Sequence, residues 1–134
     1  SANYIGKTVI ATSTELPLQN GKASFGYSFD GTPDQATMVI TNAAGNIVKV
    51  LEVDRKAGSH AVSWDGKDDQ GNQLQDGAYK VQITAINTKG EDVTSSVVVT
   101  GKVTGVSVYG GEVTLKMGSA STLLSNVQSI DETL

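Results

Sequence analysis

β-Branched residues dominate the apolar part of this sequence, and this feature most strongly limits the folds open to the chain. Valine, isoleucine and threonine together number 37, against eight leucines, and the same 134 residues contain 15 glycines. β-Branched side chains are stiff at χ1 and pack well on pleated surfaces, so they favour strands over helices. They occur in short runs separated by turn residues, which is typical of a sandwich or barrel. The sequence therefore predicts an all-β protein.

The middle of the chain has the strand count of one sandwich. In residues 22–30 the aromatic residues Phe25, Tyr27 and Phe29 alternate with small residues, the period of two of a half-buried strand. Seven or so strands of this kind predict an immunoglobulin-like or fibronectin-III-like sandwich over residues 18–100. The chain has no cysteine for an inter-sheet disulfide, so Trp64 is the expected core anchor.

The two ends of the chain, residues 1–17 and 101–134, are each shorter than the ~40 residues that usually fold alone. Both contain strand patterns, and Gly110-Gly111 predicts a hairpin turn in the second. We expect the ends to pair into a small second barrel into which the sandwich is inserted. The tail, residues 125–134, allows either a short helix capped by Ser125 or a last strand.

Charge and composition exclude several classes of function. The net charge is −4 and the ten lysines and arginines are scattered, so we expect no nucleic-acid partner. The absence of cysteine excludes disulfides, thiol catalysis and cysteine-ligated metals. No apolar run approaches the ~20 residues of a membrane span, so no membrane partner is expected. The start of the chain has neither a signal peptide pattern nor a methionine, and we expect it to be part of a longer protein.

Catalytic motifs are not expected in this sequence. His60, the single histidine, shares the parity of Trp64 on a predicted strand, and no G-x-S-x-G elbow accompanies it. A structural or surface role for His60 is therefore favoured over hydrolase chemistry. The aromatic residues of 22–30 are expected in the core rather than in a ligand platform, and no phosphate-binding glycine loop occurs.

The acidic segment 65–76 is the strongest candidate for a metal site. An EF-hand loop starting at Asp65 would need an oxygen ligand at its third position and glycine at its sixth, where this chain has Lys67 and Gln70. We therefore favour a turn in which Asp, Asn and Gly satisfy the backbone. A calcium site is the weaker alternative, with candidate ligands Asp65, Asp68, Asp69 and Asp76.

The stretch 58–85 resembles the signature of the flagellar hook-capping family, also called basal-body rod modification proteins (FlgD). The residues that carry this likeness, interpreted as a structural motif, are Trp64, Asp65, Gly66, Gly71, Gly77 and Tyr79. We interpret the two aromatic residues as core fillers from adjacent strands, and the aspartates and glycines as the turn between them. Residues 4–11 and 102–130 resemble the segments by which the family's chain enters and leaves its barrel.

The resemblance implies a tudor-like (SH3-like) barrel built from both chain ends, with an inserted fibronectin-III-like sandwich. It also implies a transient cap, thought to be a pentamer, that promotes insertion of hook subunits at the tip of the growing flagellar hook. The protein would be exported through the flagellar type III channel, with no enzymatic activity and no cofactor. The alternative from another class is a secreted immunoglobulin-like ligand-binding or adhesion module.

Overall fold

The computed structural model describes residues 3–132 and confirms the all-β prediction. Its regular structure consists of twelve strands and one 3₁₀ turn, η1 (Leu124–Asn126). The strands are β1 (Thr8–Thr12), β2 (Glu15–Leu18), β3 (Ala23–Phe29), β4 (Gln35–Thr41), β5 (Ile47–Leu51), β6 (His60–Trp64), β7 (Gly77–Ile86), β8 (Ser95–Lys102), β9 (Gly105–Tyr109), β10 (Glu112–Met117), β11 (Ala120–Leu123) and β12 (Val127–Asp131). In the part of the chain described here, no helix is long and apolar enough to cross a membrane.

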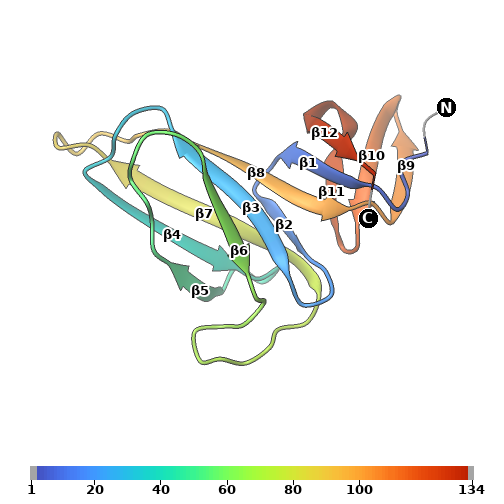
Figure 1. Cartoon of the computed structure of the whole chain (residues 1–134), viewed down its shortest axis with the longest axis horizontal. Helices are drawn as coiled ribbons and strands as arrows, with labels where there is room; N and C mark the ends of the chain where they lie inside the picture. The colour runs from blue at the N-terminus through green and yellow to red at the C-terminus, as the bar shows by residue number, and fades with distance from the viewer. Residues whose placement is uncertain (1–2, 133–134) are drawn as a thin grey trace.

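Two sheets face each other to form the larger part of the molecule (Figure 1). One has the strand order β2-β7-β4-β5, and the other ends with β8-β3-β6. The period of two predicted for these strands is observed, because alternate residues enter the shared core. The core residues include Leu16, Leu18, Phe25, Tyr27, Met38, Ile40, Trp64, Val81, Val97 and Val99.

A smaller unit forms where the two ends of the chain meet, to the right in Figure 1. β1 pairs antiparallel with β12, so that Thr8 lies opposite Asp131 and Val9 opposite Ile130. The three-stranded sheet β11-β10-β9 completes the unit. It has a core of its own, formed by Val9, Val103, Leu115 and Met117.

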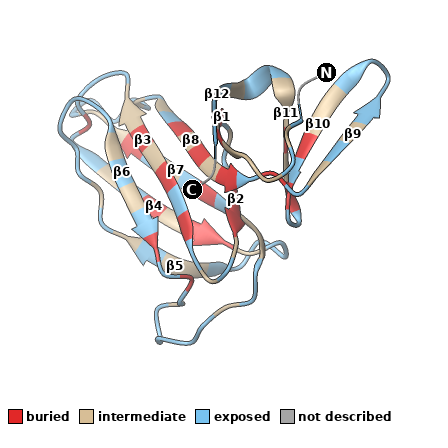
Figure 2. Cartoon of the chain, turned by 45° about the vertical axis from the view of Figure 1, so that its right-hand side comes forward, coloured by how far each residue is buried: buried red, intermediate tan, exposed pale blue. Residues whose placement is uncertain are grey.

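Strand β8 runs through both units and joins them. Ser95–Thr100 pairs with β3 of the sandwich, and Val98–Lys102 pairs with β1 of the smaller unit. The five-stranded sheet β12-β1-β8-β3-β6 is therefore continuous from one unit to the other. Figure 2 shows the buried positions gathered in the sandwich and at this joint.

The structure corrects one boundary of the predicted organisation and decides between the two alternatives for the tail. Residues Glu15–Leu18 were assigned with the barrel segment as far as residue 17, but they pair with β7 of the sandwich, because Leu16 and Leu18 complete its core. The tail forms η1 and strand β12 rather than the helix that Ser125 could cap. We propose the division into a discontinuous barrel and an inserted sandwich with this earlier boundary. Residues 1–2 and 133–134 of the predicted segments lie outside the described residues.

Candidate functional site

The aromatic pair of the sequence motif lies in the sandwich core. The rings of Trp64 and Tyr79 meet edge to face, with centroids 5.2 Å apart and an interplanar angle of 80°, a favourable geometry for aromatic pairs. Adjacent strands were expected for the two residues. They come from β6 and β7, which follow one another in the chain and belong to opposite sheets. The pair therefore joins the two layers.

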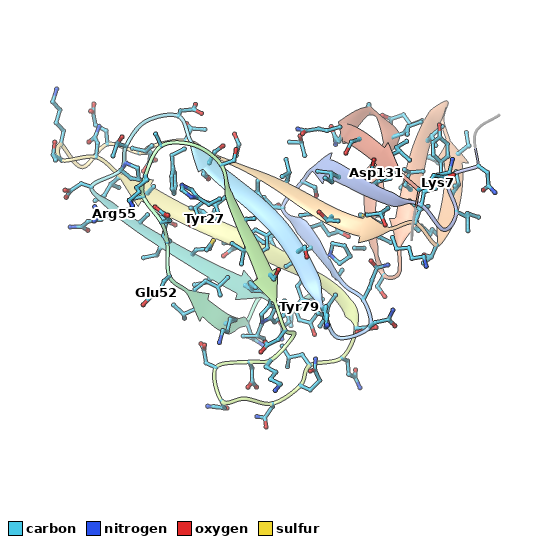
Figure 3. All side chains as sticks on the ribbon, in the orientation of Figure 1. Lys7, Tyr27, Glu52, Arg55, Tyr79 and Asp131 are labelled. Atoms are coloured by element: carbon cyan, nitrogen blue, oxygen red, sulfur yellow. The ribbon has the colours of Figure 1, made fainter. Side chains whose placement is uncertain are left out.

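Both aromatic residues also anchor the segment that separates them. Trp64 Nε1 donates a hydrogen bond to the carbonyl of Lys67 at 3.0 Å, and Tyr79 Oη donates to the carbonyl of Gln75 at 2.7 Å. Burial, and then the nearby carboxylate of Asp76, raise the pKa of the Tyr79 phenol, so it remains a hydrogen-bond donor to a higher pH than an ordinary tyrosine. Figure 3 shows Tyr79 beside this segment, with Tyr27 toward the other end of the sandwich.

The acidic segment contains a turn that occurs three times among residues 3–132. In 68–72 the Oδ1 atom of Asp68 accepts hydrogen bonds from the backbone N–H groups of Gln70 and Asn72, both at 2.9 Å. Asn42 makes the same two contacts in 42–46, and Asn87 makes them in 87–91. All three segments have Asn or Asp first and Gly fourth, a residue pattern that favours a turn closed by the side chain of the first residue.

The other aspartates of the segment attach it to neighbouring strands. Asp76 accepts hydrogen bonds from the N–H groups of Asn20 and Gly21 at 2.7 and 2.9 Å, which fixes the turn between β2 and β3. The carboxylate of Asp69 accepts from the N–H of Val50 at 3.1 Å.

The candidate calcium ligands are therefore not gathered in one place. Asp65 accepts from the N–H of Lys67 within its own turn, and each of the other three serves a different segment of backbone. Among residues 3–132 there is no group of three or more acidic, histidine or cysteine side chains that could hold a metal ion. The structural motif keeps its interpretation as a turn, with one exception. Gly77 begins β7 without a positive φ, so its conformation does not require glycine.

We expect the free energy of unfolding to fall as the pH drops through the folded-state pKa of Asp68. The N–H of Asn72 first, and then that of Gln70, hold the pKa of Asp68 below its ordinary value. Because the pKa of Asp68 is lower in the folded state than in the unfolded state, its ionised carboxylate stabilises the folded state at pH values above the unfolded-state pKa. This stabilisation is lost as the pH falls and the folded protein takes up the proton. The Asp68→Asn variant keeps the acceptor oxygen that Asn42 and Asn87 use, and it cannot titrate. Urea unfolding at stepwise lower pH should therefore show a steeper acid loss for the wild type than for the variant, and equal slopes would contradict this account.

His60 contacts the segment before β6 and the ring of Tyr27. Its Nε2 lies 2.8 Å from the carbonyl oxygen of Lys56, and its Nδ1 lies 3.5 Å from a carboxylate oxygen of Asp54. Its ring lies beside Tyr27, with centroids 5.2 Å apart. Among the described residues no serine or threonine hydroxyl is hydrogen-bonded to His60, so the pairing that a nucleophile would need is not formed.

The joint between the two units is held by contacts that the sequence did not suggest. Gln19 makes a two-way bridge to Lys102, in which its Nε2 donates to the carbonyl at 2.9 Å and its Oε1 accepts from the N–H at 3.0 Å. The carboxylate of Glu15 accepts from the N–H of Ser121 at 3.0 Å. These partners lie 83 and 106 residues apart in the chain, so no local pattern could have identified them.

A shallow hollow of about 500 Å³ lies beside this joint and the Tyr79 end of the sandwich. Its lining residues are Asn42, Ala43, Ala44, Gln75, Asp76, Gly77, Ala78, Tyr79 and Ser119. The ionisable side chains among them, Asp76 and Tyr79, are both engaged with backbone groups. Both side chains therefore hold the 65–76 segment and the turn between β2 and β3 in place.

The comparison with protein families assigns most of the chain to one domain family. Residues 13–89, more than half of the chain and including the whole motif, match the FlgD Ig-like domain. The chain belongs to the FlgD Ig-like domain family. It is 33% identical over 84 residues to the basal-body rod modification protein FlgD of Salmonella typhimurium and 32% identical over 84 residues to that of Escherichia coli, with 61% of this chain covered in each case. These matches cover 36% of each relative, so the chain spans little more than a third of their length.

Solved FlgD structures resemble the whole of this molecule, including the part outside the matched domain. The crystal structure of FlgD from Xanthomonas campestris, described in connection with hook capping essential for flagellar assembly, has a TM-score of 0.71 and 25% sequence identity. The alignment covers 96% of this chain and 94% of that one. FlgD from Pseudomonas aeruginosa has a TM-score of 0.77 at 24% identity, over 97% and 99% of the two chains, and it supports the fold alone.

Proposed function

We propose that this FlgD-family chain acts in assembly of the bacterial flagellar hook, as part of a transient cap at the distal end of the growing hook that promotes polymerisation of hook subunits. The observation that carries the proposal is the family match over residues 13–89. The likeness to FlgD from Xanthomonas campestris supports it, because that protein is linked to hook capping and resembles both units of this chain.

The proposed partners are hook subunits and further copies of the full-length protein, in a cap that we propose to be a pentamer. The proposed location is the tip of the growing hook, outside the cell, reached through the flagellar type III export channel. We propose a scaffold that uses no cofactor and catalyses no reaction. The satisfied state of His60, Asp76 and Tyr79 supports a structural role for these side chains.

The shape of the molecule suits a scaffold. The continuous sheet through β8, the Gln19–Lys102 bridge and the Glu15–Ser121 contact join the two units in one extended body. An extended body of this kind can present its edges to neighbouring subunits while its core stays fixed. We propose that contacts between cap subunits are modest and partly polar, because a cap must shift whenever a hook subunit inserts.

Genetic complementation with the full-length gene tests the proposal. In a strain that lacks its own hook cap, the gene is expected to restore hook growth, and electron microscopy of isolated basal bodies would measure the fraction that bear hooks. A matched gene that lacks residues 13–132 should leave hooks absent. Export of the intact protein without any hook growth would contradict the proposal.

A further inference from the structure

Strand β9 is the outer strand of the three-stranded sheet, and nothing pairs with its outer side among the described residues. Its exposed side chains are apolar or aromatic: Val108 is 69% exposed and Tyr109 is 90% exposed. Figure 2 shows β9 as an exposed strand at the margin of the molecule. An edge of this kind presents unpaired backbone N–H and C=O groups to solvent.

The outer side of β9 is left open because the chain turns away from it. β1 pairs with β8 only as far as Thr8 opposite Lys102. The preceding segment forms a tight turn, in which the N–H of Lys7 bonds to the carbonyl of Tyr4 at 3.1 Å. Within residues 3–7 its backbone bonds reach Val103 and no residue of β9.

Other edge strands among residues 3–132, with the exception of β6, are covered or interrupted. The outer side of β5 is covered by Asp69, whose N–H donates to the carbonyl of Val48 at 3.1 Å and whose carboxylate accepts from the N–H of Val50. β11 is tied to β2 by Glu15, and β12 has a register shift and ends at the charged Asp131. Charges, bulges and covering loops are the means by which proteins protect sheet edges. Segment 103–111 contains no residue charged at neutral pH.

We propose that β9 pairs antiparallel with β9 of a second copy of this chain, in a register centred on Ser107. In this register Val106 of one copy lies opposite Val108 of the other, which forms two apolar cross-strand pairs on one face. On the other face, Tyr109 lies opposite Gly105. The ring can cover that glycine, which has only the Lys116 side chain near it in the single copy.

The charges next to β9 favour a second copy over a charged partner. On β10, Lys116 lies opposite Gly105 and Glu112 lies opposite Tyr109, at the two ends of the pairing. Antiparallel pairing therefore places Glu112 of one copy and Lys116 of the other at the same level of the joined sheet, with the two β9 strands between them. A chain with a net charge of −4 meets its copy at this edge without contact between like charges.

The pairing is expected to be weak and reversible, because two five-residue strands bury far less than the ~1,200 Å² of a stable interface. It rests on β9 alone, and because a symmetric pair of this kind closes a dimer, it is separate from the contacts between neighbours in the proposed pentameric cap. Its failure would leave the proposed function untouched, and failure of the complementation experiment would leave the pairing untouched.

Cysteine cross-linking of this chain tests the register. Residues directly opposite each other in an antiparallel pair have Cα atoms roughly 4.5–5.5 Å apart, within the range that a disulfide can bridge. The chain has no cysteine of its own, so Ser107→Cys introduces a single thiol. Under mild oxidation this variant should form a disulfide-linked dimer several-fold faster than Ser63→Cys, the matched control at an exposed serine on edge strand β6. Equal rates for the two variants would overturn the proposal.

Sedimentation equilibrium tests the pairing without a cross-link. The weight-average mass of the wild-type chain should rise with concentration, and Val108→Lys should abolish the rise. Val50→Lys, at a 56% exposed position on β5, should preserve it. A wild-type chain that is monomeric at every concentration would overturn the proposal, and a strand from another protein would then be the expected partner of β9. A dimer that Val108→Lys does not weaken would also overturn it.

Discussion

Replacement of Trp64 by alanine is expected to lower the free energy of unfolding by about 3–5 kcal/mol. The side chain is 3% exposed in the sandwich core, so its removal leaves a large cavity there. The change also removes the edge-to-face contact with Tyr79 and leaves the carbonyl of Lys67 without its indole donor. Since Trp64 and Tyr79 come from opposite sheets, the loss weakens the contact between the two layers.

Urea unfolding followed by far-ultraviolet circular dichroism would measure this loss, since the variant lacks the only tryptophan of the chain. Tyr109→Ala is the matched control. It also removes a large aromatic ring, but from a side chain that is 90% exposed, and its effect should stay within about 0.5 kcal/mol. A Trp64→Ala variant as stable as this control would contradict the assignment of Trp64 as the core anchor.

Replacement of Gly66 by alanine is expected to destabilise the protein more than replacement of Gly71, although both glycines lie in the same segment at similar positive φ angles of 73° and 83°. A Cβ atom at Gly66 would lie 2.8 Å from the backbone oxygen of Gly21 and 2.6 Å from the side-chain nitrogen of Gln73. A Cβ atom at Gly71 would meet nothing within 4 Å.

The two variants separate conformational strain from steric overlap. Gly71→Ala should cost about 1–2 kcal/mol for the left-handed backbone alone. Gly66→Ala should cost roughly 1–3 kcal/mol more, since overpacking forces neighbouring groups to move. Chemical denaturation of the two variants in parallel measures the difference. An equal loss of stability in the two variants would show that the backbone at Gly66 can move to accept a Cβ atom. The short distance to the backbone oxygen of Gly21 would then not require glycine at this position.

The turn at 68–72 is an example of a structure that local sequence can predict. Its residues repeat the Asn-x-x-Gly pattern of 42–46, with aspartate in place of asparagine, and the backbone bonds are the same. The Asp, Asn and Gly residues of 65–76 predict a turn, and both bonds of Asp68 lie within five residues of the chain. Asp69 and Asp76 were beyond prediction, because their partners Val50 and Asn20 are brought near only by the fold.

The sequence by itself determined that the chain is all-β, where most strands lie, which residues alternate into the core, and which family the Trp64 motif indicates. These properties follow from side-chain stereochemistry and from short-range turn chemistry, which a window of ten residues contains. Only the tertiary structure decided that Trp64 and Tyr79 meet from opposite sheets, that Glu15–Leu18 joins the sandwich, and that β9 keeps an open side. Each of these three features depends on pairing between segments that are far apart in the chain. The energy of such a pairing depends on which side chains the complete fold buries and which backbone groups it brings together.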